Sequence, residues 1–283
     1  MKFLHSIPAL IVFLLAGFTL QAQVDLINAK DFMDLTKKCD NLVIVDANKP
    51  KNYEVNHIKG AINIDHNDLY RDGDIKGLIK SPEELAAFFG EKGINEDSRV
   101  VVYDDGSQKY SSRLYWILKY IGAKKVEILH KDMDDFRTAR VPLTAVPGKY
   151  AVTTFTPNVD IDYIINLKDV QDRKDLPGVV LIDCREADEF NGLKNSEGHI
   201  PGAVNLNYED LLTETGAFKN KVELMAIAEK YGITADTEVI LYCRTSVRAT
   251  VEFVAFRNIL GFKNVKVYDG AYLEWVANQP VVQ

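Results

Sequence analysis

The segment VILYCRTSVRATVEFVAFRNILG, Val239–Gly261, decides the fold of this chain because it repeats an earlier one. The earlier copy is VVVYDDGSQKYSSRLYWILKYIG, Val100–Gly122, and the two align without a gap. Each copy begins with a short apolar run, continues through a polar stretch and ends in a longer segment closed by glycine. This order is typical of a buried strand, a loop and a helix with a glycine C-cap. The sequence therefore predicts the same strand–loop–helix unit twice.

Two further motifs return in the same order and extend the repeat over most of the chain. HIKGAINID at 57–65 returns as HIPGAVNLN at 199–207. LVIVDA at 42–47 returns as VVLIDC at 179–184. A repeat unit of about 120 residues has the size of a domain, so these matches indicate a domain duplication rather than a solenoid.

The boundary between the two copies falls in VPGKYAVTTFTP, residues 146–157. Pro147, Gly148 and Pro157 interrupt the apolar pattern there, as they do in connecting segments. We therefore expect domain 1 at residues 23–148, a linker at 149–154 and domain 2 at 155–283.

Within each copy, short β-branched runs alternate with segments of helical spacing. Ser81 and Glu84 have the spacing of a capping box, with Pro82 at the first helical position. Strands that alternate with helices predict an α/β fold, with a parallel sheet covered by helices on both faces. Reactive groups in such sheets collect at the carboxyl ends of the strands, and Cys243 follows directly after one.

Composition limits the classes of partner. The 283 residues carry a formal net charge of −7, with acidic and basic residues interspersed. No basic stripe is present to follow a phosphate backbone, so we expect no nucleic-acid partner.

The amino terminus has the pattern of a secretory signal peptide at residues 1–22. A short basic end precedes the apolar run Ile7–Leu20, and the small Ala22 marks a cleavage position. The apolar run is short for a membrane span, although an uncleaved anchor helix is the alternative. We therefore expect an exported protein, periplasmic or secreted, without a membrane span after cleavage.

Cys243 has the surroundings of a nucleophile. The loop Cys243–Arg248 runs from a strand end into a helix amino terminus, where backbone N–H groups and the helix dipole favour an anion. Arg244 and Arg248 add positive charge, and all of these effects favour the reactive thiolate. The alternative is a buried structural cysteine with two solvated arginines. A metal site is not expected, because the chain has no CxxC or HxxxH spacing.

Several motifs together resemble the tandem-domain rhodanese family of thiosulfate and 3-mercaptopyruvate sulfurtransferases. They are the duplicated HI(K/P)GA(I/V)N, DCRE at 183–186, CRTSVR at 243–248 and VYDGAYLEW at 267–275. The resemblance implies two α/β domains, each with a parallel five-stranded sheet flanked by helices. It also implies that only domain 2 is catalytic, and the sequence agrees, since Asp104 stands where copy 2 has Cys243.

The resemblance implies a covalent sulfur transfer. The Cys243 thiolate would attack the sulfane sulfur of a small anionic donor, thiosulfate or 3-mercaptopyruvate, and form a persulfide. A thiol or cyanide would then remove the sulfur, and no cofactor is needed. We expect a monomer, because duplication supplies within one chain what a homodimer supplies between two.

The resemblance also assigns the residues that bind the donor. These are Arg185 after the second-copy strand and the loop residues Arg244, Thr245, Ser246, Val247 and Arg248. His57 would form part of the wall of the cleft. The alternatives are a surface Arg185 paired with Glu186 or Glu189, and a structural turn role for His57, since His199 repeats it.

The loop departs from the family pattern at two positions, which leaves the donor open between thiosulfate and 3-mercaptopyruvate. Thr245 stands where thiosulfate enzymes often have lysine and mercaptopyruvate enzymes have serine. Ser246 stands where glycine is usual, and a left-handed backbone there costs a serine more than a glycine.

The remaining cysteines and two other functions complete the hypotheses. Cys184 is interpreted as a buried small residue, with a disulfide to Cys243 or a role in resolving the persulfide as the alternative. Cys39 is interpreted as structural.

A phosphatase of the same fold would need Cys-x5-Arg, whereas Cys243 and Arg248 form a shorter Cys-x4-Arg loop. A non-catalytic sulfur carrier of the cell envelope is the alternative from another class.

Overall fold

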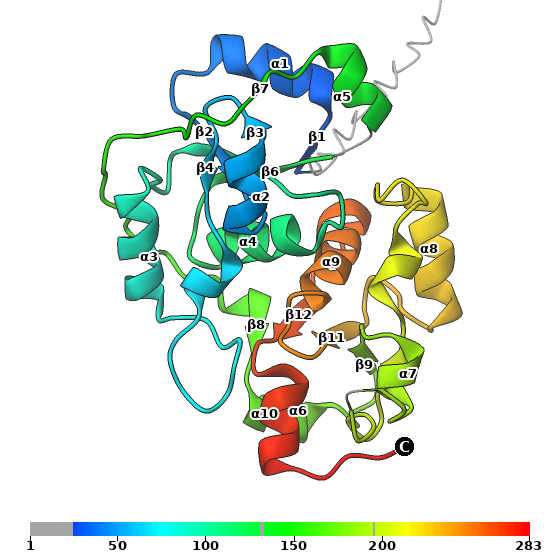
Figure 1. The fold of residues 1–283 in the computed structure, drawn as a ribbon. Helices are drawn as coiled ribbons and strands as arrows, with labels where there is room; N and C mark the ends of the chain where they lie inside the picture. The colour runs from blue at the N-terminus through cyan, green and yellow to red at the C-terminus, as the bar shows by residue number, and fades with distance from the viewer. Residues whose placement is uncertain (1–24, 131–132, 195) are drawn as a thin grey trace, which may run out of the picture.

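Two parallel five-stranded sheets form the frame of the molecule (Figure 1). The computed structural model describes residues 25–130, 133–194 and 196–283, so the predicted signal peptide at 1–22 lies outside the described residues. All strand pairs within the two sheets are parallel, and helices flank both sheets. The predicted α/β fold with two tandem domains is confirmed.

Each sheet has three longer strands between two short edge strands. In spatial order, the domain 1 sheet contains β1 (Leu26–Ile27), β6 (Lys125–Leu129), β5 (Arg99–Tyr103), β2 (Leu42–Asp46) and β4 (Ile62–Asn63). The domain 2 sheet contains β10 (Val204–Asn205), β9 (Val179–Asp183), β11 (Glu238–Tyr242), β12 (Val265–Tyr268) and β8 (Ile164–Ile165). A separate antiparallel pair joins β3 (His57–Ile58) to β7 (Leu143–Thr144).

The helices follow the predicted alternation with the strands. Domain 1 has α1 (Ala29–Lys38), α2 (Pro50–Val55), α3 (Pro82–Glu91), α4 (Lys109–Tyr120) and α5 (Met133–Ala139). Domain 2 has α6 (Leu167–Arg173), α7 (Ala187–Phe190), α8 (Lys221–Lys230), α9 (Ala249–Phe253) and α10 (Ala271–Asn278). Single 3₁₀ turns lie at His66–Leu69, Ile161–Tyr163 and Tyr208–Leu211.

Local sequence explains where the helices begin and end. The capping box of α3 is complete: the Ser81 hydroxyl accepts from the Glu84 N–H, and the Glu84 carboxylate accepts from the Ser81 N–H. The helix expected to end at Gly261 does so, with Gly261 at φ +82°. Only its first part is α-helical, however, because Val254–Leu260 continues α9 as a π-helix.

The strand register brings corresponding carboxyl ends together. β2 and β5 pair from Leu42 with Arg99 to Asp46 with Tyr103. β9 and β11 pair in the same way, with Asp183 opposite Tyr242. Because neighbouring strands end level, the next residues of each pair also lie side by side at the sheet edge. This register sets Cys184 next to Cys243.

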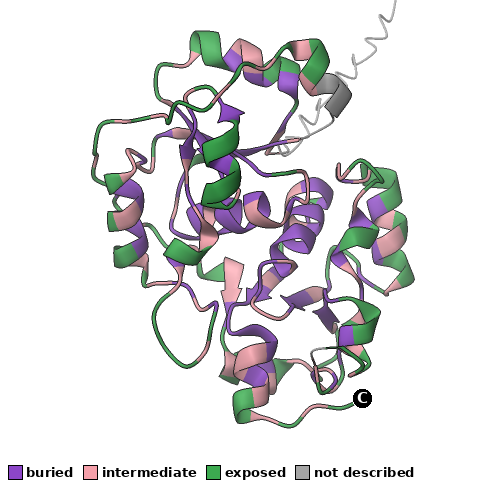
Figure 2. Ribbon diagram, viewed as in Figure 1, coloured by how far each residue is buried: buried purple, intermediate pink, exposed green. Residues whose placement is uncertain are grey.

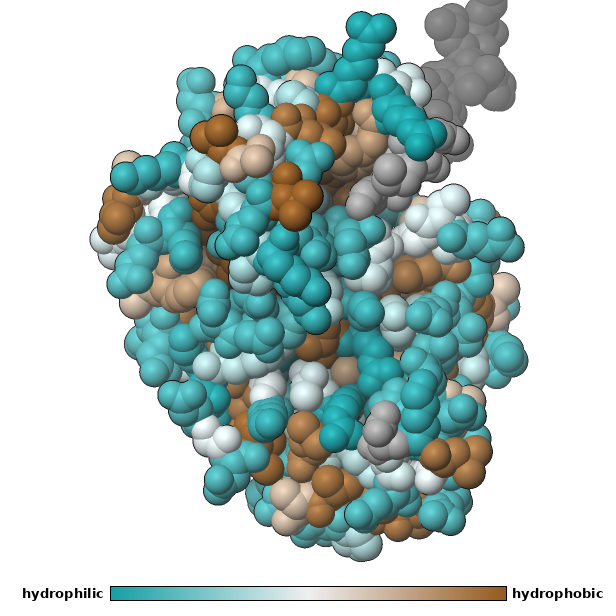
Figure 3. All heavy atoms as spheres, viewed as in Figure 1, coloured by the Kyte–Doolittle hydropathy of each residue, from teal (hydrophilic) through white to brown (hydrophobic). Residues whose placement is uncertain are grey.

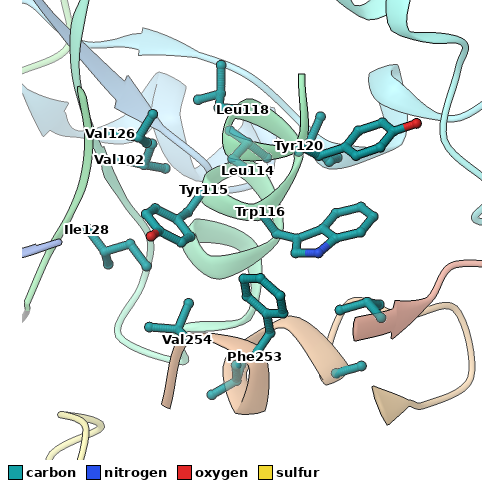
Figure 4. Close-up of a cluster of buried hydrophobic side chains, with 14 of the residues drawn as sticks. Val102, Leu114, Tyr115, Trp116, Leu118, Tyr120, Val126, Ile128, Phe253 and Val254 are labelled. Atoms are coloured by element: carbon teal, nitrogen blue, oxygen red, sulfur yellow. The ribbon is translucent and has the colours of Figure 1, made fainter. Parts of the chain in front are cut away.

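The inner faces of both sheets share one hydrophobic core. α4 and α9 pack against each other at its centre (Figures 1 and 2), and both helices are almost wholly buried. Figure 4 shows Tyr115 and Trp116 of α4 on the side of that helix that faces Phe253 of α9 and Val254, the first residue of the π-helix. Separate buried clusters fill the outer face of each sheet. The two domains are therefore joined by a common core.

The connection between the domains packs onto domain 1. Residues 145–160 contain no helix or strand, and the predicted linker 149–154 lies inside this segment. The Thr153 N–H donates to the Gly90 carbonyl at 2.9 Å, and Phe155 is buried in the shared core.

Hydrophilic side chains predominate on the face drawn in Figure 3. In the described part of the chain, no helix has the length and apolar character to cross a membrane.

Candidate active site

Cys243 lies at the carboxyl end of the central strand of domain 2, where the chain turns into α9. Its side chain is 1% exposed. The first turn of α10 covers the start of the loop, since the Tyr272 N–H donates to the Cys243 carbonyl at 3.0 Å and the Leu273 N–H to that of Arg244 at 3.3 Å. The sequence prediction of a strand–loop–helix unit around this cysteine agrees with this arrangement.

Ser246 gives the loop the backbone shape that glycine would give. Its φ is +59°, in the left-handed region, and its side chain is fully buried. The hydroxyl donates to the Tyr268 carbonyl at 2.5 Å. This hydrogen bond offsets the steric cost of a left-handed serine. The departure from the family pattern at Ser246 therefore leaves a glycine-like turn in place.

Arg248 is held by a carboxylate that sequence reasoning did not place at the site. Its guanidinium binds Glu189 of α7 through two contacts, at 2.5 and 3.0 Å. Burial alone would lower the pKa of Arg248, but Glu189 and the Cys243 side chain raise it. The pKa of Glu189 is lowered, because Arg248 outweighs the effect of burial. The positive charge of Arg248 at the site is thus partly balanced.

The other predicted loop residues differ in exposure. Arg244 and Thr245 are half-buried, and Val247 is buried. Thr245 packs against Gly77 of domain 1. A Cβ placed on Gly77 would come within 2.7 Å of the Thr245 Cβ. Gly77 has φ +92°, so both its space and its backbone require glycine. Domain 1 therefore covers the loop with the segment between its 3₁₀ turn and α3.

Arg185 is engaged by groups of its own domain, and its predicted role in donor binding stays a prediction. It is fully buried, and its Nε donates to both oxygens of its own neighbour Asp183, at 2.9 and 3.0 Å. Its terminal nitrogens donate to the Ser196 hydroxyl and the Gly198 carbonyl, and the guanidinium lies over the Tyr272 ring. The alternative of a surface arginine paired with Glu186 or Glu189 is wrong, because the residue is fully buried. The buried Arg185 side chain folds back and hydrogen-bonds Asp183 at the end of the preceding strand.

His57 belongs to a cavity of domain 1. It is 2% exposed and stacks on Tyr53 at 3.8 Å between ring centroids. Its ring nitrogens lie 2.6 Å from the Tyr53 carbonyl oxygen and 3.0 Å from that of Val146. Both nitrogens are therefore engaged by backbone. This placement agrees with the structural alternative, and the expected position of His57 in the wall of the Cys243 cleft stays a prediction.

Tyr70 extends from domain 1 toward the surroundings of Cys243. The His66 Nδ1 lies 2.8 Å from its hydroxyl, and Arg113 lies over its ring. Burial raises the pKa of Tyr70 to about 12, and Cys243 is among the smaller influences in the same direction. A phenol with such a pKa stays protonated at neutral pH and can donate a hydrogen bond.

The two domains contact each other through matching hydrogen bonds. The Ile79 N–H of domain 1 donates to the Asp269 Oδ2 of domain 2 at 2.9 Å. At the corresponding place, the Phe218 N–H of domain 2 donates to the His130 Nε2 of domain 1 at 2.8 Å. Arg113 of α4 completes the first contact with an ion pair to Asp269 at 2.7 Å. The interface thus has approximate twofold symmetry with one charged and one neutral half.

Cys184 and Glu252 form a buried acidic pair beneath the Cys243 loop. Both are fully buried, and within the described part of the chain neither carboxyl oxygen of Glu252 has a hydrogen-bond partner. Burial raises the pKa of Glu252 well above its usual range, and the nearby Cys184 thiol opposes this without completing a hydrogen bond. Burial also raises the pKa of Cys184, with Glu252 and Cys243 adding to it. Burial therefore favours the protonated form of both groups.

Glu252 was not among the residues predicted from the sequence, although the sequence contains a signal for it. It is the one carboxylate within the apolar segment after the loop, and by the repeat alignment its counterpart in α4 is Arg113. The three cysteines Cys39, Cys184 and Cys243 are all free thiols. Cys184 agrees with its interpretation as a buried small residue.

Asp104, the counterpart of Cys243, occupies its own loop with its carboxylate. It accepts backbone N–H groups from Gly106, Gln108, Tyr110 and Ser111 at 2.8–3.2 Å. Burial raises the pKa of Asp104, and the N–H groups of Ser111 and Gly106 act against the rise. A loop of this architecture therefore accommodates an oxygen anion two bonds beyond the Cβ of its first residue.

Metal binding has no matching cluster at this site. Among residues 25–130, 133–194 and 196–283, no group of three or more His, Cys, Asp or Glu side chains is arranged to hold a metal ion.

Comparison with known proteins gives two domain matches and relatives over most of the chain. The model of the rhodanese-like domain matches residues 28–139 and again residues 166–278. A protein of Haloferax volcanii, provisionally named a thiosulfate sulfurtransferase, is 29% identical over 233 residues, which are 79% of this chain and 81% of that protein. A sulfur carrier protein of Thermus thermophilus is 29% identical over 245 residues, with 79% and 83% covered.

A solved structure has the same fold over nearly its full length. The Escherichia coli protein described with the rhodanese fold and the catalytic mechanism of 3-mercaptopyruvate sulfotransferases superposes with a TM-score of 0.78. The two are 28% identical, and the match covers 88% of this chain and 99% of that one.

Proposed function

The chain belongs to the rhodanese-like sulfurtransferase family, with two such domains in tandem, and on that premise we propose that Cys243 carries the sulfur. Cys243 takes a sulfane sulfur from a small anionic donor of the thiosulfate type and holds it as a persulfide. It then passes the sulfur to a thiol or to cyanide.

The observation that carries this proposal is the hydrogen bonding of Asp104. Four N–H groups donate to the Asp104 carboxylate, two from the loop (Gly106 and Gln108) and two from the first turn of α4 (Tyr110 and Ser111). A cysteine persulfide has the same reach, because its outer sulfur also lies two bonds beyond Cβ. We infer that backbone N–H groups of the 244–248 loop and of the first turn of α9 hold the outer sulfur of Cys243, as the N–H groups around Asp104 hold its oxygens.

The reaction proceeds in two displacements at sulfur. The Cys243 thiolate attacks the outer sulfur of thiosulfate, a new S–S bond forms, and the old S–S bond breaks with its electron pair leaving on sulfite. The acceptor thiolate then attacks the outer sulfur of the persulfide. The acceptor becomes a persulfide, and Cys243 returns as a thiolate.

The preference for thiosulfate rests on the charges near Cys243 and on a relative. Arg244 and Arg248 both follow Cys243, and the relative from Haloferax volcanii has a thiosulfate name. The runner-up donor is 3-mercaptopyruvate, supported by the similarity to the Escherichia coli structure.

A sulfur carrier is the second candidate function. It is favoured by the name of the Thermus thermophilus relative. It is also favoured by the 1% exposure of Cys243, because only a narrow acceptor group can reach so buried a sulfur. A carrier makes one stoichiometric transfer, whereas an enzyme turns over.

The experiment that tests the proposed function measures kcat/KM for thiosulfate and for 3-mercaptopyruvate with cyanide as acceptor. Cys243→Ser is the inactive reference, and Cys39→Ser is the matched control that removes a thiol outside the site. We expect steady-state turnover that prefers thiosulfate, requires Cys243 and survives the loss of Cys39. A single burst without turnover supports the carrier, and hydrolysis of an aryl phosphate by Cys243 contradicts sulfur transfer.

Export stays a proposal that rests on residues 1–22. Expression of the full chain in a bacterial host and determination of the mature amino terminus test it. An intact Met1 in the cytoplasm contradicts it.

A further inference from the structure

Domain 1 has a cavity of its own at the carboxyl edge of its sheet. Its volume is about 370 Å³, within the range of roughly 300–1,000 Å³ that is typical of small-molecule sites. Asp46, Asn48 and Tyr103 line its sheet side, and Phe136 and Arg140 line the side formed by the end of α5 and the residue after it. Nothing in the proposed sulfur chemistry uses this cavity.

The backbone around Asp46 has the same shape as that around Asp183 in domain 2. The Asn48 N–H donates to the Asp46 Oδ1 at 2.8 Å, and the Arg185 N–H donates to the Asp183 Oδ1 at 3.0 Å. In both domains an asparagine side chain from the neighbouring strand binds the carbonyls of these two residues. The two carboxylates therefore occupy equivalent positions at their sheet edges.

The side chains in front of the two carboxylates differ. In domain 2 the Arg185 guanidinium covers Asp183 and engages both carboxylate oxygens. In domain 1 the corresponding residue is Asn48, which is too short to turn back in this way. The arginine that closes the sheet edge of domain 2 therefore has no equivalent at the same position of domain 1.

Two buried acceptors in domain 1 lack hydrogen-bond partners among the described residues as a result. They are the Asp46 Oδ2 and the Asn48 Oδ1. The Tyr103 hydroxyl accepts the Ile58 N–H at 2.9 Å and keeps its own hydrogen for the nearby Asp46, but its geometry leaves the Asp46 Oδ2 without a completed hydrogen bond. Burial raises the pKa of Asp46, as expected for a carboxylate without a cation. Buried acceptors are nearly always paired in native proteins, so these two are available to accept hydrogen bonds from a molecule that enters the cavity.

The rest of the cavity offers apolar surface for the stem of a ligand, and a positive charge opposite to the negative charge of Asp46. Phe136, Ile58 and Val141 supply apolar surface. Arg140 lines the cavity, is exposed, and has a left-handed backbone at φ +53°. A left-handed arginine is uncommon and its backbone strain lowers stability, and strained residues of this kind are concentrated at functional sites. The cavity therefore combines an anionic end with a cationic one.

We propose that this cavity binds a small amino-acid-type zwitterion. Its guanidinium or ammonium group donates to the Asp46 Oδ2 and the Asn48 Oδ1, in the place that Arg185 fills in domain 2. Its carboxylate pairs with Arg140, and its stem lies against Phe136. The site is independent of Cys243 and stands whether or not domain 2 transfers sulfur.

The first test is titration calorimetry of the full chain with L-arginine as the probe. We expect saturable binding at one site, and binding at least tenfold weaker for agmatine, which keeps the guanidinium and lacks the carboxylate. Asp46→Asn should weaken L-arginine binding by tenfold or more. Glu54→Gln, which removes an exposed charge on neighbouring α2, and Cys243→Ser should bind as the wild type does.

The second test fills the cavity from within. Asn48→Arg restores the pairing that domain 2 has, so it should abolish L-arginine binding and raise Tm. This variant also keeps the test decisive if Asp46→Asn does not fold. Absence of saturable binding to the wild type overturns the proposal, and so does unchanged binding to Asn48→Arg or to a folded Asp46→Asn.

Discussion

Asp104 and Cys243 stand at the same position in the two domains, at the carboxyl ends of β5 and β11, yet their loops are used in opposite ways. The Asp104 carboxylate accepts four N–H groups of its own loop and of the first turn of α4, and so occupies this position permanently. Cys243 has a side chain one atom shorter, which leaves room for an added sulfur. The comparison teaches that the same strand–loop–helix position serves either as a closed structural turn or as a cradle for a transferred atom, although the left-handed residue is Gln108 in one loop and Ser246, one aligned position earlier, in the other.

The difference between the domains extends to the residues around these loops. Domain 2 closes Asp183 with Arg185 and leaves the buried Glu252 without a hydrogen-bond partner among the described residues, whereas domain 1 pairs Arg113 with Asp269. Arg113 therefore has a charged partner, whereas its counterpart Glu252 has none among the described residues. Stability and chemistry are distributed unevenly over the repeat, and substitutions at matched positions separate them.

The charged half of the domain interface should give the largest loss of stability. Asp269→Asn breaks the buried pair with Arg113 and leaves an unpaired guanidinium, which costs about 3–5 kcal/mol. His130→Ala, at the neutral half, should cost about 1 kcal/mol, since it removes one hydrogen bond. Urea unfolding of both variants measures the difference. Equal losses would contradict a charged and a neutral half.

The Asp104 loop should lose stability without losing function. Asp104→Ala leaves buried N–H groups without an acceptor and should destabilise the protein by about 3 kcal/mol. Sulfur transfer from thiosulfate should stay within about twofold of the wild type in the folded variant.

Cys243→Ala is the matched variant in domain 2. It should abolish sulfur transfer and cost only about 1 kcal/mol, because a small buried atom is removed. Thermal unfolding and the cyanide assay on both variants give the comparison, and a loss of activity in Asp104→Ala equal to that in Cys243→Ala would break it.

Glu252 should make stability depend on pH. Its pKa is raised in the folded state, so the folded protein keeps the proton after the unfolded chain has lost it. Wild-type stability should therefore fall as pH rises above about 4, the unfolded value, and continue to fall toward the folded pKa. Glu252→Leu should remove this slope and gain about 1–2 kcal/mol at pH 7.

The control for Glu252 is an exposed carboxylate in the same domain. Glu229→Leu on α8 should leave the pH dependence unchanged. Urea unfolding at pH 4–8 compares the three proteins. A difference between the wild type and Glu252→Leu that does not grow with pH would show that Glu252 is ionised when folded.

The smallest effect is expected at Ser246. Ser246→Gly relieves a left-handed backbone at φ +59° but loses the hydrogen bond to the Tyr268 carbonyl. These changes oppose each other, so stability should change by less than about 1 kcal/mol. Ser246→Ala keeps the strain and loses the hydrogen bond, so it should cost more than Ser246→Gly in thermal unfolding. The reverse order would mean that the backbone is not strained.

The sequence was sufficient for the features that depend on local pattern and on the repeat. The parallel sheets, the Ser81–Glu84 capping box and the position of Cys243 at a strand end all follow from spacing. The contacts of Arg185 do not follow from spacing, because its side chain folds back onto Asp183 and the sequence does not record this direction. The contact of Arg248 with Glu189 joins two segments far apart in the chain, so only the folded structure brings it to light.

The measurement that tests the central claim most directly is mass spectrometry of the protein after treatment with thiosulfate. The account predicts a protein one sulfur atom heavier, with the added mass on the Cys243 peptide and removed by cyanide. Cys39 and Cys184 should carry no sulfur, since the Cys184 thiol stays protonated in its buried position. An added sulfur on Cys184 or Cys39, or no adduct with either thiosulfate or 3-mercaptopyruvate, would contradict the account.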